Sequence, residues 1–179
     1  MSTMNTTSTS HPHLRTTHKN VAWILAAIHE MLDESMYHCE TLRHTLHAHH
    51  NLKAATVFEE LCPHILSEQV LMQDAIGSML LPEIPPWEIP YHDYIHPVSA
   101  LTHAHYLMSE SEAWKTMSDI VQVHSCFYSY LLEKDQQPEI EALLKQLRKL
   151  NAECQTICRQ HQTPNDVLPA DLDPPIPQS

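Results

Sequence analysis

Apolar side chains recur every three or four residues along four long stretches of the chain. This spacing lines one face of an α-helix, and the alternating steps are those that antiparallel bundles need. The pattern predicts helices at 19–48, 52–80 and 98–134, the third open to interruption, and a last helix that begins near Pro138. The same stripes predict a buried core that includes Ile28, Leu42, Phe58, Ile65, Ile120, Phe127, Leu147 and Leu150.

The segments between the stripes predict how the helices connect. Short turns at 49–51 and 135–137 each join two helices into a hairpin, and a proline-rich link at 82–97 is long enough to cross the bundle. We therefore expect an all-α four-helix bundle over 19–161, made of two helical hairpins joined by a long Pro-rich crossover. Residues 1–18 are rich in Ser and Thr, and residues 162–179 are Pro-rich and acidic, so both ends are expected to be disordered.

Composition narrows the classes of function. The formal net charge of −12 disfavours nucleic acid and anionic membrane surfaces as partners. No apolar run approaches the roughly 20 residues that span a bilayer, which favours a cytoplasmic protein. The five cysteines lack a C-x-x-C pattern, so we expect buried free thiols in a reducing compartment. They are Cys39, Cys62, Cys126, Cys154 and Cys158.

Three passages resemble the rubrerythrin branch of the ferritin-like superfamily. AAIHEMLDESMYHCETL and ATVFEELCPHILSEQVL resemble its first hairpin, and SCFYSYLLEKDQQPEIEALLKQLRKLNAECQTI resembles its second. In that second hairpin an aromatic ends the third helix, an Asp-rich turn follows, and the fourth helix carries Glu-x-x-His. The resemblance covers about residues 19–160 and implies a four-helix bundle with a central di-iron centre.

The metal ligands of that family are missing from the matching positions. These positions hold Ser35, Gln69 with Met72, His124, and Asn151 with Cys154. If the frame slips by one, the alternatives are Glu34, Glu68 with Leu71, Gln122, and Glu153 with Thr156. Neither frame restores both His ligands, so a di-iron oxidase is not predicted. His124 on an apolar face is expected to be a hydrogen-bonded core residue.

A different metal site is open to the first hairpin. Glu34 and His38 are four residues apart on one helical face, as are His64 and Glu68. The turn near residue 51 would set Glu34 opposite Glu68 and His38 opposite His64. Both pairs lie on the same flank of their stripes, so they either meet between the helices or both point away. If they meet, two imidazoles and two carboxylates form a site suited to Fe, Zn or Mn.

Two functions remain from these patterns. The first is a non-catalytic bundle that acts through protein association, as a homo-oligomer or with a protein partner, its di-iron centre lost. The alternative is a metal-binding or metal-dependent redox protein with a rearranged His/carboxylate site. The missing Glu-x-x-His pair favours the first, and covalent catalysis is not predicted, because the sequence has no nucleophile elbow or Walker motif. The sixteen His residues keep the second open, although the group His44, His47, His49 and His50 is more typical of a helix C-terminus.

Overall fold

The computed structural model describes residues 21–85, 88–89, 104–134 and 137–161. Over these ranges the protein is helical and has no strand, as predicted. The helices are α1 (Val21–Ala48), α2 (Leu52–Ile76), α4 (Glu110–Lys134) and α5 (Pro138–His161). None of them combines the length and the apolar character that a membrane crossing needs. The predicted disordered ends, 1–18 and 162–179, lie outside the described residues.

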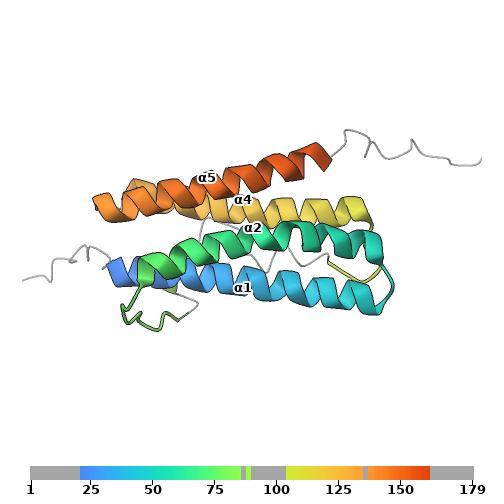
Figure 1. Ribbon diagram of the computed structural model, residues 1–179, viewed down its shortest axis with the longest axis horizontal. Helices are drawn as coiled ribbons and strands as arrows, with labels where there is room; N and C mark the ends of the chain where they lie inside the picture. Colours follow the sequence, from blue (N-terminus) through green and yellow to red (C-terminus); the bar gives the residue numbers. More distant parts are fainter. Residues whose placement is uncertain (1–20, 86–87, 90–103, 135–136, 162–179) are drawn as a thin grey trace, which may run out of the picture.

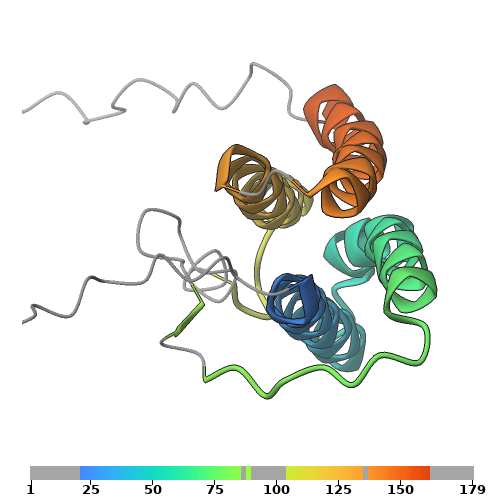
Figure 2. The same cartoon turned by 90° about the vertical axis from the view of Figure 1, so that its left-hand side faces the viewer.

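The helices pack as two antiparallel pairs, α1 with α2 and α4 with α5 (Figure 1). The helix α2 packs against both members of the other pair, whereas α1 contacts α4 only slightly. An end-on view shows the four helices grouped around one interior (Figure 2). Because α2 ends and α4 begins at opposite ends of the bundle, these two helices run in the same direction (Figure 1). Most of the predicted link at 82–97 lies outside the described residues.

The turn between α1 and α2 is built by a left-handed residue, His50, with φ of 60°. The His50 amide donates to the carbonyl of His47, and the Asn51 amide donates to the carbonyl of Leu46. These two bonds form a Schellman motif, which satisfies carbonyls at the end of a helix. The turn predicted near His50 is therefore confirmed. Residues 135–136 of the second predicted turn lie outside the described residues.

The helix α4 begins later than predicted, at Glu110, and residues 104–109 are not helical. A capping box sets this start. The Ser109 amide donates to Glu112 Oε2 at 2.6 Å, and the Glu112 amide donates to Ser109 Oγ at 3.2 Å. The preceding segment is fastened to the first turn, because Asn51 Nδ2 donates to the carbonyls of Tyr106 and Met108.

The helix α2 also ends earlier than predicted, at Ile76 rather than near residue 80. Gly77 follows with φ of 54° and ψ of −117°, a conformation that is essentially restricted to glycine. Its amide still donates to the carbonyl of Gln73, so the helix closes its last turn before the chain leaves.

Most of the predicted core is buried in the interior between the two pairs. The residues Ile28, Phe58, Ile65, Ile120, Phe127 and Leu147 are all at most 1% exposed. Leu42 and Leu150 are only half-buried, so the prediction that they are buried was wrong. All five cysteines are free thiols. Three of them are buried, whereas Cys62 and Cys126 are half-buried.

Candidate functional site

Polar side chains from all four helices meet in the interior of the bundle. This central polar cluster consists of Ser35 on α1, Glu68 on α2, His124 and Tyr128 on α4, and Asn151 on α5. Each of them is at most 2% exposed. A buried polar group is costly unless it is hydrogen-bonded, so the partners of each one decide what the cluster does.

The carboxylate of Glu68 is the centre of the cluster. The Tyr128 hydroxyl donates to Glu68 Oε2 at 2.5 Å. The Asn151 amide lies 3.4 Å from Glu68 Oε1 and also donates to the carbonyl of Val121 at 3.2 Å. Both carboxylate oxygens therefore have a donor nearby, and the bond from Tyr128 is short, as bonds to charged acceptors are.

His124 joins the cluster to α1. Ser35 Oγ donates its proton to the carbonyl of Met31 at 2.8 Å, so the same oxygen accepts from His124 Nε2, also at 2.8 Å. The other ring nitrogen, Nδ1, lies 3.4 Å from Glu68 Oε2. That contact is close enough for an ion pair but is not aligned as a hydrogen bond.

The donor set does not fit a di-iron centre. The cluster holds one carboxylate and one imidazole, and its other members are a hydroxyl, a phenol and an amide. Within the described ranges, no three or more His, Cys, Asp and Glu side chains are arranged to hold a metal ion. The geometry is that of a hydrogen-bonded network, which stabilises one arrangement of the four helices when its members are satisfied.

The sequence anticipated part of this cluster. Ser35, His124 and Asn151 occupy the central positions that were expected, but α2 contributes Glu68 rather than Gln69. The slipped frame therefore holds on α2 for Glu68 alone, because Met72 of the unslipped frame, rather than Leu71, is buried. Tyr128 was missed, although it lies one helical turn after His124 on the same face of α4.

The structure does not bring together the four predicted metal ligands Glu34, His38, His64 and Glu68. His38 Nε2 lies 3.8 Å from Glu34 Oε1 on α1. Glu68 points into the central polar cluster with Tyr128, and His64 is half-buried on α2. The two chelating pairs therefore do not converge on one site.

The sequence correctly predicted which residues of α1 and α2 stand at the same level along the hairpin. It was wrong about which side of α1 faces α2. Gln69 Nε2 donates to Asp33 Oδ1 at 2.8 Å, and Arg43 lies 4.0 Å from Glu59, so α1 and α2 meet along this flank. A helix turns about 100° per residue, so Glu34 points about 100° away from its neighbour Asp33. Glu34 and His38, its neighbour one turn along α1, thus lie away from the flank that faces α2.

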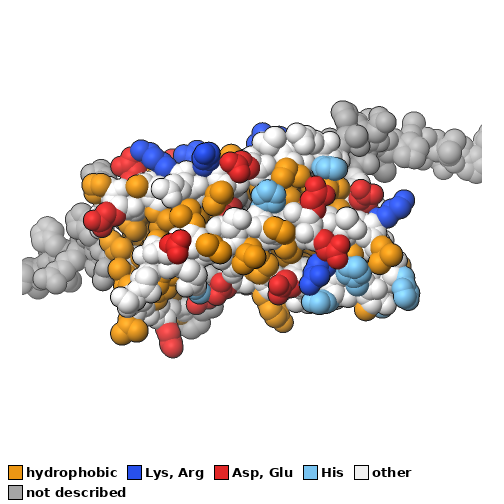
Figure 3. Space-filling model, in the orientation of Figure 1, with side chains coloured by type: hydrophobic (Ala, Val, Ile, Leu, Met, Phe, Trp, Pro, Cys, Tyr) orange, Lys and Arg blue, Asp and Glu red, His pale blue; other side chains and the backbone are white. Residues whose placement is uncertain are grey.

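The histidines at the end of α1 contact different partners. On the face shown in Figure 3, His side chains gather toward the end that carries the α1/α2 turn. His47 Nε2 lies 2.7 Å from Glu59 Oε1, and His49 stacks on Tyr106 with ring centroids 4.4 Å apart. His44 Nε2 contacts its neighbour Arg43 at 3.2 Å. These contacts support a structural role for the group.

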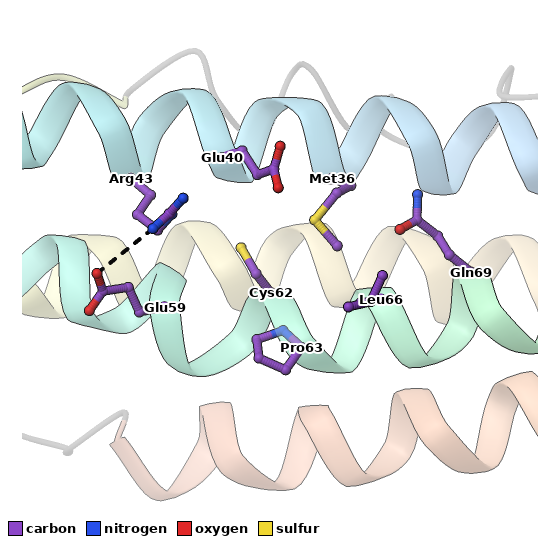
Figure 4. A pocket seen from close by; sticks show the side chains of 8 residues that line it. All are labelled: Met36, Glu40, Arg43, Glu59, Cys62, Pro63, Leu66 and Gln69. Carbon is purple, nitrogen blue, oxygen red and sulfur yellow. Dashed lines mark ion pairs between the residues drawn. The ribbon is translucent and has the colours of Figure 1, made fainter.

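A groove runs along the outer surface between α1 and α2. We call it the α1/α2 groove. Its volume is about 560 Å³, and it is open to solvent. Figure 4 shows its lining, which is Met36, Glu40, Arg43, Glu59, Cys62, Pro63, Leu66 and Gln69. Its middle is apolar, and both signs of charge lie toward one end.

Two thiols meet beside this groove. Cys62 lines it, and the buried Cys39 lies behind it on α1. Hydrogen bonding with Cys39 lowers the pKa of the Cys62 thiol, and Arg43 lowers this pKa further, although burial opposes both. The same bond, together with burial, raises the pKa of Cys39 well above its usual range. Cys62 is therefore the thiol of this pair that ionises first.

No family model, curated protein or solved structure matches this chain. The ferritin-like relationship therefore stays a prediction.

Proposed function

We propose that this protein is a non-catalytic, ferritin-like bundle that acts by association, and that its partner is a second copy of the same chain bound over the α1/α2 groove. Two features support the relationship to that superfamily. The helices form two antiparallel pairs, with α2 and α4 in the same direction (Figure 1). The central polar cluster takes residues from all four helices, as the metal centre of that family does.

The observation that carries the proposal is the apolar character of this outer face. Leu66 is 53% exposed in the middle of the groove, and Val70, one turn further along α2, is 54% exposed. Met36 faces Leu66 from α1 (Figure 4). Clustered apolar side chains rimmed by polar ones are typical of protein interfaces.

The charges around the groove favour a second copy as the partner. Arg43 lies at one end, whereas Asp33, which is 52% exposed, lies at the other. A two-fold axis at the level between Met36 and Glu40 would set Arg43 of each copy opposite Asp33 of its partner. Because the chain has a net charge of −12, two copies repel each other at long range. Two such ion pairs would offset that repulsion and fix the register.

A charge swap tests this arrangement by sedimentation of the full chain. Arg43→Asp and Asp33→Arg each set like charges against each other, so each should weaken dimerisation about tenfold or more. The double variant restores opposite charges across the interface and should recover most of the wild-type affinity. Lys115→Asp makes the same change in charge as Arg43→Asp on α4, at a side chain that is 71% exposed, and should leave dimerisation unchanged.

Two results would contradict the proposal. One is a wild-type chain that stays monomeric at every accessible concentration. The other is a double variant that associates no better than either single variant, since the rescue is specific to the Arg43–Asp33 pairing.

Metal binding remains the second candidate. The observation in its favour is the buried Nδ1 of His124, which faces Glu68 without a well-directed hydrogen bond. Metal analysis of tag-free protein purified without metal affinity would test it. Stoichiometric Fe, Zn or Mn that is lost in His124→Ala would favour this candidate, and metal-free wild-type protein would dispose of it.

A further inference from the structure

The thiols Cys39 and Cys62 lie on facing helices at the same level of the first hairpin. Arg43 and Glu59 form an ion pair about one turn to one side of them. Cys62 faces the α1/α2 groove with its sulfur directed toward α1 (Figure 4). Cys39 is fully buried behind it, with its sulfur 3.6 Å from that of Met117. Cys62 is thus open to small reagents, whereas Cys39, at the same level of the facing helix, is shielded.

The surroundings of Cys62 are suited to a nucleophilic thiolate. Hydrogen bonding with Cys39 and the guanidinium of Arg43, which lines the same groove, both lower the pKa of the Cys62 thiol. Burial of the thiol opposes this effect, and the carboxylates of Glu40 and Glu59 oppose it to a smaller extent. Cysteines in proteins become reactive when a nearby cation and a hydrogen-bond donor stabilise the thiolate.

We propose that Cys62 is a site of reversible oxidation by a hydroperoxide, and that Cys39 resolves the product into a disulfide that links α1 to α2. The Cys62 thiolate attacks the terminal oxygen of the hydroperoxide, the O–O bond breaks, and the leaving alkoxide or hydroxide takes a proton. This two-electron step leaves a sulfenic acid on Cys62. The Cys39 sulfur then attacks the Cys62 sulfur, the S–O bond breaks, and the departing hydroxide combines with the Cys39 proton as water.

The other cysteines, all in the described part of the chain, lack one of the two requirements. Cys154 and Cys158 are one turn apart on α5, and their contact lowers the pKa of Cys158, but both are buried. Cys126 is half-buried, and its described contact is the amide of Gln122 at 3.3 Å. Access and a neighbouring thiol therefore coincide at Cys62.

This inference does not depend on the proposed self-association, although both involve the same groove. The test therefore uses a dilute sample that sedimentation shows to be monomeric, so that a second copy cannot shield Cys62. The full chain is treated with hydrogen peroxide, and its cysteines are mapped by mass spectrometry. Wild-type protein should lose two free thiols, form a Cys39–Cys62 linkage, and regain both thiols with dithiothreitol.

Three alanine variants separate the roles. Cys62→Ala should form no disulfide, and Cys39→Ala should retain a sulfenic acid on residue 62 that dimedone labels. Cys126→Ala, the matched change at a half-buried thiol, should behave as wild type. Far-UV circular dichroism checks that each variant is folded. At pH 7, Cys62 should react about tenfold faster than Cys126.

The inference is overturned if Cys126 reacts as fast as Cys62, or if Cys39→Ala retains the wild-type loss of two thiols. It is also overturned if Cys62 is oxidised in the wild type without a linkage to Cys39. Because none of these outcomes depends on dimerisation, failure here leaves the charge-swap test unaffected.

Discussion

Removal of one hydroxyl group tests whether the central polar cluster stabilises the bundle. Tyr128→Phe deletes the donor that lies 2.5 Å from Glu68 Oε2 and keeps the aromatic ring in place. Hydrogen bonds to charged groups contribute about 1.5–3 kcal/mol, and a buried acceptor that loses its donor is costly. Both residues are at most 2% exposed, so bulk water does not replace the donor. We therefore expect the free energy of unfolding to fall by about 2–3 kcal/mol.

The effect is measurable, because single domains are stable by only about 5–15 kcal/mol in total. The assay is urea unfolding followed by circular dichroism, with a double-mutant cycle. The variants are Tyr128→Phe, Glu68→Gln and the two combined. Because the two side chains are in contact, their coupling energy should be about 1–2 kcal/mol. Tyr37→Phe is the matched control at a ring that is 66% exposed, and it should change stability by less than about 0.5 kcal/mol.

A loss of less than about 0.5 kcal/mol in Tyr128→Phe would refute this reasoning, as would a double variant that is simply additive. The free energy lost when the Glu68 carboxylate leaves water would then equal the free energy gained from its hydrogen bonds, as happens in some buried ion pairs.

Three further predictions concern helix ends. Ser109→Ala should lower stability by about 1 kcal/mol by urea unfolding, because the capping box of α4 loses its side-chain bond. The bonds from Ser109 lower the pKa of Glu112, so its contribution is present above the ordinary Glu pKa and is lost as pH falls through the lowered value. When stability is measured as pH is lowered, Glu112→Gln should lack this part of the loss. A variant whose stability falls with pH in the same way as that of the wild type would contradict the assignment. Gly77→Ala should cost about 1–3 kcal/mol from backbone strain alone, since an added Cβ meets only the Asp74 carbonyl at 4.0 Å, and unchanged stability would refute it.

The helices and the first turn were predictable because their signals are local. The stripe along α1 and the polar residues after it determine where the helix ends, and His50 takes the left-handed conformation there. The start of α4 was not predicted, because apolar residues continue at helical spacing through 98–108. The capping signal of Ser109 and Glu112 was present in the sequence and would have corrected the boundary.

The central polar cluster was predictable only to within one residue. The apolar stripe of α2 gives the helical phase approximately, and an error of one residue turns the side chain by about 100°. That error separates the buried Glu68 from Gln69, which instead donates to Asp33 on the outer flank. Tyr128 was missed for another reason, since a tyrosine within an apolar stripe is typical of core packing and its hydroxyl partner lies on a different helix.

The wrong flank of the predicted metal site has the same origin. A short turn fixes which residues of α1 and α2 stand at the same level, but the apolar stripes give the rotation of each helix only approximately, so they did not determine which flank of α1 faces α2. Under the proposal above, the interior stabilises the fold and the groove mediates association. Tyr128→Phe should weaken the fold and leave dimerisation intact. The paired Arg43 and Asp33 exchange should alter dimerisation and leave the coupling between Tyr128 and Glu68 unchanged, because distant sites contribute independently. If either variant changed both properties, the interior and the groove would have to be treated as one coupled unit.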